Sequence, residues 1–242
     1  MNAVPVSAEN EPLLDAARLQ RADTVVRQQP FAFLIAQDQL PDAARGDLAR
    51  DFPRYPSAGF FPHEVNDCGP SVNRLIGDLT SREFADAIGR HLGIPDLGRY
   101  PSLVTLCRLL NKRHGTIHTD SRSKVATALL YLEPEWPNGS AGALRFLSRI
   151  DSIDAMVAPE VAPVYGTIAA FKRADDSFHG HLPFEGERKV IQVAWLTSLE
   201  EMERKTRRGR FSRLLKKIAG RLDAWWGSGR GRDASHPTRT EK

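Results

Sequence analysis

The chain has 242 residues, 41% of them hydrophobic, and a formal net charge of +4. This length and apolar content are enough for a sizeable buried core, which excludes a disordered chain. The two cysteines, Cys68 and Cys107, lie far apart, so a disulfide framework and a CxxC metal or redox site are excluded as well. No apolar signal segment and no run of eighteen apolar residues occurs, so we expect a cytoplasmic protein without a membrane span.

The positive charge is concentrated near the C-terminus. Residues 204–232 contain eleven Lys or Arg and a single acid, Asp223, which gives this segment a net charge of +10. The remainder of the chain therefore carries −6. The sequence predicts an acidic body and one strongly basic segment, which need not serve the same purpose.

The N-terminal part begins with a predicted helix and a strand. An incomplete helical stripe of apolar residues over 12–28 predicts a helix. The apolar run FAFLIA at 31–36 has the length of a strand. An Ala-rich stretch follows Asp42 and is closed by Pro53, which predicts a further short helix.

A longer helical pattern follows. Over 71–94 the apolar residues recur at steps of three and four, which predicts one or two helices broken near Thr80. Ser81 is placed to cap the second of them, with a glutamate in its first turn. We expect residues 1–99 to form a helical support region packed on the core.

The pattern changes to β-like runs between Tyr100 and Leu199, separated by clusters of Pro, Gly, Asn and Asp. No helical pattern of ten residues lies between these runs, so a sandwich or barrel is favoured over βαβ units. We expect residues 100–200 to form this β-domain behind the helical layer. The predicted strands are 103–110, 124–133, 142–147, 161–172 and 188–196.

One constellation in this region suits metal chemistry. His118 and Asp120 stand two apart after a strand-like run, and residues two apart on a strand face the same side, so both can bind one ion. His179, about sixty residues later, would complete two histidines and one carboxylate, a ligand set that leaves positions open on iron. Arg188 follows nine residues after His179, and its guanidinium suits a dicarboxylate through paired hydrogen bonds.

These stretches resemble the 2-oxoglutarate and iron(II)-dependent oxygenases, specifically their prolyl 4-hydroxylase-like branch. The resemblance spans about 103–196. It implies a double-stranded β-helix, or jelly roll, and hence an α+β protein with an N-terminal helical layer and a C-terminal basic amphipathic helix. The matching segments are His118 to Asp120, Ala128 to Glu133 with Trp136, Gly142 to Phe146, and Ser177 through Arg188 to Trp195.

The resemblance also implies roles for single residues. His118, Asp120 and His179 would be the iron ligands, and Arg188 would hold the distal carboxylate of 2-oxoglutarate. The co-substrates implied are 2-oxoglutarate and O2, with ascorbate as a further candidate cofactor, and the implied reaction is hydroxylation of a C–H bond with decarboxylation to succinate. The carboxylate of Asp120 argues against the halogenating variants. Two further residues, Tyr131 and Gln192, are the remaining candidates for contact with the co-substrate.

Simpler interpretations stand beside this one. His118 and Asp120 taken alone fit a surface pair in a hairpin, and His181 is an alternative to His179 as the third ligand. The cations around the HxD motif fit either a rim for an anionic substrate or ordinary solvated loop charges. Phe60, Phe61 and His63 fit a lid over the site, and the two phenylalanines fit equally well as core residues under a long loop. The rim cations are Lys112, Arg113, Arg122 and Lys124.

Residues 201–242 are expected to form a basic amphipathic helix followed by a disordered tail. Apolar residues from Phe211 to Trp226 recur at helical steps, with Lys and Arg on the other face. This pattern is typical of a helix that lies on an anionic membrane surface, through 204–226, at the inner face of the membrane. A helix packed on the β-domain is the alternative, and a nucleic-acid partner is not expected because the apolar face would stay unexplained.

The function predicted from these features is an Fe(II)- and 2-oxoglutarate-dependent dioxygenase. Its substrate would be a peptidyl, prolyl-type group, or an envelope saccharide or other small molecule, with succinate and CO2 as co-products. Two alternatives are a non-catalytic jelly-roll binding module and a cupin-like metalloenzyme that does not use 2-oxoglutarate. A plain binder has no need of the arginine at position 188.

Overall fold

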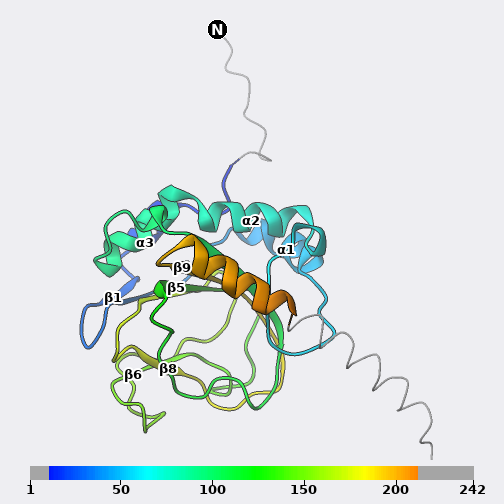
Figure 1. Cartoon of the computed structure of the whole chain (residues 1–242). Coiled ribbons are helices and arrows are strands. Elements are labelled where there is room, and N and C mark those ends of the chain that lie inside the picture. The colour runs from blue at the N-terminus through cyan, green and yellow to red at the C-terminus, as the bar shows by residue number, and fades with distance from the viewer. Residues whose placement is uncertain (1–10, 212–242) are drawn as a thin grey trace, which may run out of the picture.

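The computed structural model describes residues 11–211, in which helices form one layer and strands two (Figure 1). The helices are α1 (Arg45–Asp51), α2 (Pro70–Thr80) and α3 (Arg82–Leu92), and residues 199–211 are helical as well. The strands are β1 (Val25–Arg27), β2 (Phe33–Ala36), β3 (Phe60–Pro62), β4 (Ser102–Leu110), β5 (Lys124–Tyr131), β6 (Arg145–Leu147), β7 (Ile168–Lys172), β8 (Phe178–Gly180) and β9 (Gly186–Leu196).

The strands form a large and a small antiparallel sheet. The large sheet has seven strands in the order β1-β2-β7-β5-β9-β4-β3, and the small sheet pairs β6 with β8. Isolated bridges, such as that between Leu144 and Val161, extend the small sheet. Figure 1 shows the small sheet below the large one and the helices above it. This is the double-stranded β-helix predicted for the protein.

Alternation along the central strands creates two separate cores. On β9, Ile191, Val193 and Trp195 are buried against the helices, whereas Val190 belongs to the core between the two sheets. Successive side chains of a strand point to opposite faces, so Arg188 and Gln192 share the face of Val190. The strand that covers the helical core therefore also supplies polar groups to the space between the sheets.

The helical layer forms where the sequence predicted it. The helix over 71–94 is broken at Ser81, whose hydroxyl accepts a hydrogen bond from the backbone N–H of Phe84 and so caps α3. Gly93 ends α3 in the left-handed conformation with φ 64°. The buried faces of α2 and α3, including Leu75 and Ile88, pack on the large sheet.

One expectation for the N-terminal part is wrong. Residues 12–28 are not one helix, because the chain forms a short 3-10 helix at Ala16–Gln20 and then β1. The β-branched residues of β1 pair with β2 across the sheet edge, and this tertiary pairing overrides a weak helical stripe. Besides the helices, residues 1–99 supply three strands to the large sheet, β1 and β2 at one edge and β3 at the other.

The strands predicted over 100–200 are present, and one more appears. β8 was not predicted as a strand because it is three residues long and contains the ligand candidate His179. At the C-terminal end, residues 199–211 form a helix that crosses the front of the molecule in Figure 1. Most of the predicted basic amphipathic segment, from 212 onward, lies outside the described residues. Among residues 11–211, no helix has the length and apolar character needed to cross a membrane.

Candidate metal centre

A cavity of about 330 Å³ opens between the two sheets, within the size range of small-ligand sites. Side chains from β4, β5, β7, β8 and β9 and from the loop before β5 line it. Its walls are apolar on several sides, and its polar groups converge from different strands. The lining residues are Phe60, Leu110, His114, Gly115, His118, Asp120, Lys124, Thr127, Leu129, Leu144, Phe171, His179, Gly180, His181, Arg188 and Gln192.

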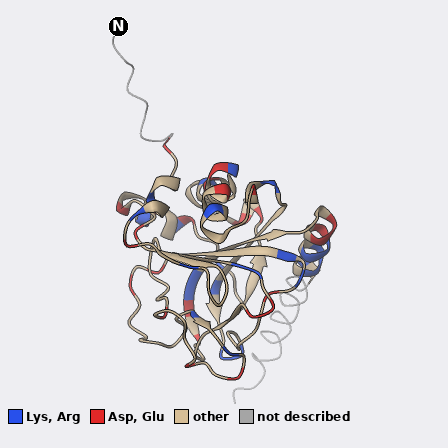
Figure 2. Cartoon of the chain, turned by 90° about the vertical axis from the view of Figure 1, so that its left-hand side faces the viewer, with Lys and Arg blue, Asp and Glu red and all other residues tan. Residues whose placement is uncertain are grey.

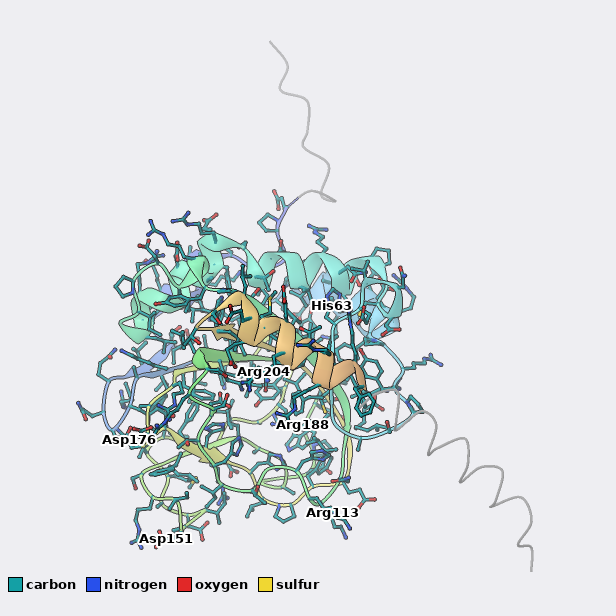
Figure 3. The ribbon with its side chains drawn as sticks, viewed as in Figure 1. His63, Arg113, Asp151, Asp176, Arg188 and Arg204 are labelled. Atoms are coloured by element: carbon teal, nitrogen blue, oxygen red, sulfur yellow. The ribbon has the colours of Figure 1, made fainter. Side chains whose placement is uncertain are left out.

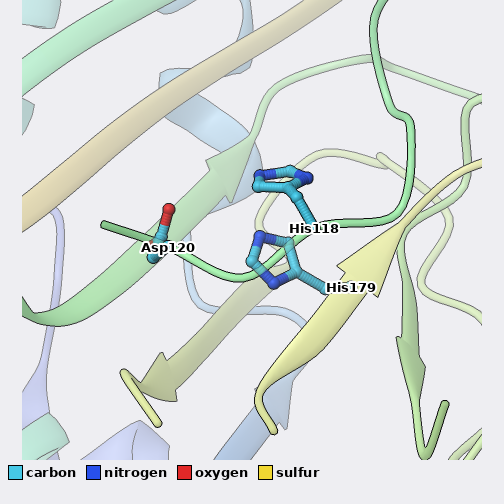
Figure 4. A group of neighbouring side chains, drawn as sticks. All are labelled: His118, Asp120 and His179. Carbon is cyan, nitrogen blue, oxygen red and sulfur yellow. The ribbon is translucent and has the colours of Figure 1, made fainter. Parts of the chain in front are cut away.

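His118, Asp120 and His179 meet in this cavity. Their candidate ligand atoms all lie within 4.8 Å of one another, and Figure 4 shows the two imidazole rings beside the carboxylate of Asp120. The backbone explains the meeting, because the N–H of His118 donates to the carbonyl of His179 at 3.1 Å and the N–H of His179 donates back at 3.0 Å. The histidines are therefore paired across the small sheet.

Backbone carbonyls determine which nitrogen of each histidine faces the cavity. Nδ1 of His118 lies 2.8 Å from the carbonyl oxygen of Thr116, and Nδ1 of His179 lies 2.9 Å from that of Ser177. A carbonyl oxygen only accepts, so each Nδ1 carries the proton. The lone pair of each Nε2 is then free for a metal ion, the arrangement commonly found behind metal-bound histidines.

The protonation states suit metal binding near neutral pH. Burial lowers the pKa of His179 to about 4, although the charge of Asp120 acts in the opposite direction. The imidazole is therefore neutral at pH 7. For Asp120, burial raises the pKa, but the charge of Lys124 and hydrogen bonds from Lys124 and Thr127 outweigh burial, so its pKa is lowered and the group is a carboxylate.

The carboxylate of Asp120 is held by two neighbours on β5. Nζ of Lys124 donates to Oδ1 at 2.7 Å, and Oγ1 of Thr127 donates to Oδ2 at 2.6 Å. No role for Thr127 was predicted from the sequence, and Lys124 was predicted only as a rim charge. A usable signal was present in the sequence, because Thr127 is the one polar residue apart from Tyr131 in the apolar run 125–132, and it is buried in the structure.

A second polar pair is formed by Arg188, which lines the same cavity, and the buried Tyr131. Arg188 is 3% exposed, and its guanidinium donates from Nη2 to the hydroxyl of Tyr131 at 3.1 Å. Its Nε has no hydrogen-bond partner among residues 11–211. An unpartnered donor in a buried guanidinium is costly unless a ligand accepts from it. Arg188 lies inside the body of the molecule, below the helix that carries Arg204 (Figure 3).

The remaining candidates take different places. Gln192 lines the cavity, and its Nε2 donates to Oγ1 of Thr105 at 3.4 Å. His181 lines the cavity too but does not belong to the group that can hold one metal ion. Its ring packs against Gly115, where an added Cβ would lie 2.2 Å from the imidazole. The geometry therefore favours His179, and not the alternative His181, as the third metal ligand.

Phe60 and Phe61 were each predicted as either a lid residue or a core residue, and the structure places them differently. Phe60 is 36% exposed and lines the cavity, whereas Phe61 is 3% exposed and belongs to the helical core. They are neighbours on β3, so their side chains point to opposite faces. One phenylalanine is at the site entrance and the other is a core residue.

The residues present fit an iron(II) ion with 2-oxoglutarate. Two imidazoles and one carboxylate form the ligand set that suits iron and leaves positions open. Ligand atoms bind a first-row metal at roughly 2.0–2.2 Å, so three atoms within 4.8 Å of one another need only small movements. The unpartnered Nε of the buried Arg188 can donate a hydrogen bond to a carboxylate of 2-oxoglutarate.

Comparison with protein families gives an independent result. Residues 104–197 match the family model of the 2OG-Fe(II) oxygenase superfamily. No curated protein matches the chain significantly. The match runs from within β4 to the end of β9 and supports a dioxygenase over a binding module or a cupin-like enzyme.

Several solved structures are similar in fold. A prolyl-4-hydroxylase from Pseudomonas putida shares 18% identity with a TM-score of 0.48, over 69% of this chain and 92% of that one. A viral collagen prolyl hydroxylase from Paramecium Bursaria Chlorella virus-1 shares 15% identity with a TM-score of 0.45, over 68% and 96%. A prolyl hydroxylase from Trichoplax adhaerens, in complex with a peptide fragment of hypoxia inducible factor, shares 13% identity with a TM-score of 0.45, over 68% and 83%.

Proposed function

We propose that this protein, a 2-oxoglutarate-dependent dioxygenase with its 2OG-Fe(II) oxygenase domain at residues 104–197, hydroxylates an unactivated C–H bond of a peptidyl, prolyl-type substrate. The observation that carries the proposal is one cavity that joins a two-histidine, one-carboxylate group to a buried arginine with an unpartnered Nε. In the balanced reaction, one oxygen atom of O2 enters the substrate C–H bond and the other enters succinate, as 2-oxoglutarate loses CO2.

In this proposal His118, Asp120 and His179 hold the iron. The bound iron supplies the redox chemistry by which O2 and 2-oxoglutarate oxidise the substrate. The chain fixes the orientation of both imidazoles through their Nδ1 hydrogen bonds. Lys124 and Thr127 keep the carboxylate of Asp120 ionised and fixed in direction, as partners of a metal ligand commonly do.

Arg188 binds the distal carboxylate of 2-oxoglutarate in this proposal. The hydroxyl of Tyr131 accepts from Nη2 of Arg188, which fixes the guanidinium and leaves Nε for the ligand. Burial raises the pKa of Tyr131, although the charge of Arg188 opposes the rise, so the phenol stays protonated and has a hydroxyl hydrogen to donate. Gln192 adds an amide on the same strand face, and Leu129, Leu144 and Phe171 restrict water.

The reaction class is tested by co-substrate turnover. Purified protein with Fe(II), 2-oxoglutarate and O2 is expected to form succinate, measured by mass spectrometry, and omission of the metal or addition of a chelator is expected to abolish it. Ascorbate, proposed as a reductant that keeps iron in the Fe(II) state, is expected to raise the total turnover. Binding of 2-oxoglutarate that does not depend on the metal, together with no succinate under any condition, would contradict the dioxygenase assignment at this site.

The peptide substrate has one competitor. An envelope saccharide or another small molecule would enter the same cavity, and a screen of prolyl peptides, nucleotide sugars and lipid-linked intermediates separates the two. Stimulated succinate formation with a matching hydroxylated product identifies the substrate class.

Within the chain, we propose that residues 1–99 support the oxygenase domain, which lies in residues 100–200.

We further propose that residues 204–226 attach the protein to an anionic membrane surface at the inner face of the membrane. Phe211, the first apolar residue of the predicted membrane face, is 62% exposed on the described helix. In a flotation assay, the intact chain is expected to float with phosphatidylcholine vesicles only when they contain phosphatidylglycerol, because the segment is cationic. A chain cut after Phe211 is the control and should stay unbound. Equal recovery of the intact chain from neutral and anionic vesicles would rule the attachment out.

A further inference from the structure

The helix over residues 199–211 lies against the rim of the cavity. Nζ of Lys205 donates to Oγ of Ser121 at 3.0 Å, and Ser121 directly follows Asp120. Farther along, Arg210 forms an ion pair with Glu64 at 2.7 Å, and the helix approaches Pro62 so closely that a Cβ on Gly209 would lie 2.5 Å from its ring. The helix therefore connects the loop after Asp120 to the strand that carries Phe60 and borders the cavity entrance.

Lys205 occupies an unfavourable position for a cation. Its side chain is half-buried, and no carboxylate lies within ion-pair distance of its ammonium group among residues 11–211. Glu201, one turn earlier on the helix, is paired with Arg204 instead. Burial and the nearby charge of Lys124 together lower the pKa of Lys205, despite the opposing charges of Glu201 and Asp120. A half-buried ammonium beside a second one costs free energy until an anion approaches.

The charges in the site with Fe(II) and 2-oxoglutarate bound also favour an anionic ligand near Lys205, an argument that rests on the proposed function. The two positive charges of Fe(II) match the two negative charges of 2-oxoglutarate, and Asp120 matches Arg188. The ammonium groups of Lys124, which lines the cavity in contact with Asp120 at 2.7 Å, and of Lys205, at its edge, therefore give the loaded site a net charge of +2. Within residues 11–211, the only acid besides Asp120 whose charge acts on Lys205 is Glu201, which is paired with Arg204.

The surrounding rim has the same sign. Lys112, Arg113 and Arg122 are exposed on the loops that border the metal centre, and none forms an ion pair within the described part of the chain. On the helix, the acidic residues Glu200, Glu201 and Glu203 precede the basic residues of the later turns, and Glu201 hydrogen-bonds Ser123 (Figure 2). A cationic rim raises the local concentration of anionic ligands and accelerates their association.

We propose that the substrate of this enzyme carries an anionic group, a carboxylate or a phosphoryl group, which binds at the cavity entrance between Lys124 and Lys205. The hydroxyl of Ser121, already in contact with Lys205, is within reach to donate a third hydrogen bond. Lys205 is thus a specificity-determining residue from outside the oxygenase domain. Its place on the C-terminal helix makes recognition of the substrate depend on the docking of that helix.

The experiment uses the full chain loaded with Mn(II) and 2-oxoglutarate, with protein in excess over metal and at constant ionic strength. Inorganic phosphate and ¹³C-acetate are the two probes, and the paramagnetic relaxation of ³¹P and ¹³C reports binding near the metal. At least one probe is expected to bind to the native chain. Replacing Lys205 with glutamine (Lys205→Gln) is expected to weaken that binding about tenfold, the loss that removal of one charge-assisted hydrogen bond produces.

Two matched variants make the result decisive. Lys205→Arg keeps the charge and should retain most of the binding, which separates charge from damage to the helix. Arg208→Gln removes an exposed cation from the same helix and should leave binding unchanged. Phosphate binding alone indicates a phosphoryl substrate, and acetate binding alone indicates a carboxylate. Equal relaxation with native and Lys205→Gln protein, or no relaxation of either probe, overturns the proposal, whereas failure of Mn(II) or 2-oxoglutarate to bind would overturn the proposed function itself.

Discussion

Replacing Asp120 with alanine is expected to lower the affinity for Fe(II) by more than a hundredfold and to abolish succinate formation. Loss of a mere hydrogen-bonding partner of a metal ligand already costs about 10–100-fold in metal affinity, so loss of the one anionic ligand costs more. Asp120→Ala also leaves the ammonium of Lys124 without its partner in the cavity. Metal affinity is measured directly by titration with Mn(II) or Fe(II) under nitrogen.

The matched control for this change is Asp154→Ala. Asp154 is an exposed carboxylate that pairs with Arg145 at 2.8 Å on the far loop of the small sheet. Its removal should leave metal affinity and turnover near the native values. His118→Ala and His179→Ala are expected to behave like Asp120→Ala. If all three variants bind Fe(II) as tightly as the native chain, the metal centre lies elsewhere.

Replacing Arg188 with methionine is expected to raise the KM for 2-oxoglutarate by about 10–100-fold. A hydrogen bond to a charged group contributes about 1.5–3 kcal/mol, and the buried guanidinium has Nε free for such a bond. Methionine has a similar length and suits the apolar surroundings, so the fold should be retained. Initial rates of succinate formation over a range of 2-oxoglutarate concentrations give the KM, and thermal unfolding checks the fold.

A smaller change separates the charge of Arg188 from its orientation. Tyr131→Phe removes only the hydroxyl that accepts from Arg188, a neutral partner 3.1 Å away. Its expected effect on the KM is therefore several-fold rather than tenfold or more, in line with about 0.5–1.5 kcal/mol for an ordinary hydrogen bond. An unchanged KM in Arg188→Met with intact metal binding would show that 2-oxoglutarate binds without this arginine.

Much of the site architecture follows from local sequence rules. Alternation along β9 is enough to put Arg188 and Gln192 on one face, because side chains two apart on a strand share a side. Ser81 was predicted as a cap because a hydroxyl at that position satisfies a free N–H at the start of a helix, and it does so in the structure. Such features depend on residues only a few positions apart.

Errors arose where distant residues compete with local preference. The helix predicted over 12–28 gave way to β1, because pairing with β2 satisfies the backbone of a β-branched segment at the sheet edge. β8 was missed because three residues carry too little periodicity to be recognised. Its pairing with β6 and with His118 comes from elsewhere in the chain.

The sequence alone determined the chemical character of this protein. The residue types His118, Asp120, His179 and Arg188, in an order and spacing that resemble one oxygenase branch, predicted the cavity group that the structure brings together. Tertiary structure alone decided the rest, namely that Thr127 and Lys124 hold Asp120 and that Tyr131 orients Arg188. It also placed Lys205, 84 residues beyond Ser121, at the edge of the same site. Periodicity and motif spacing report only on neighbours along the chain, whereas these contacts join elements that meet only when the sheets and the C-terminal helix pack together.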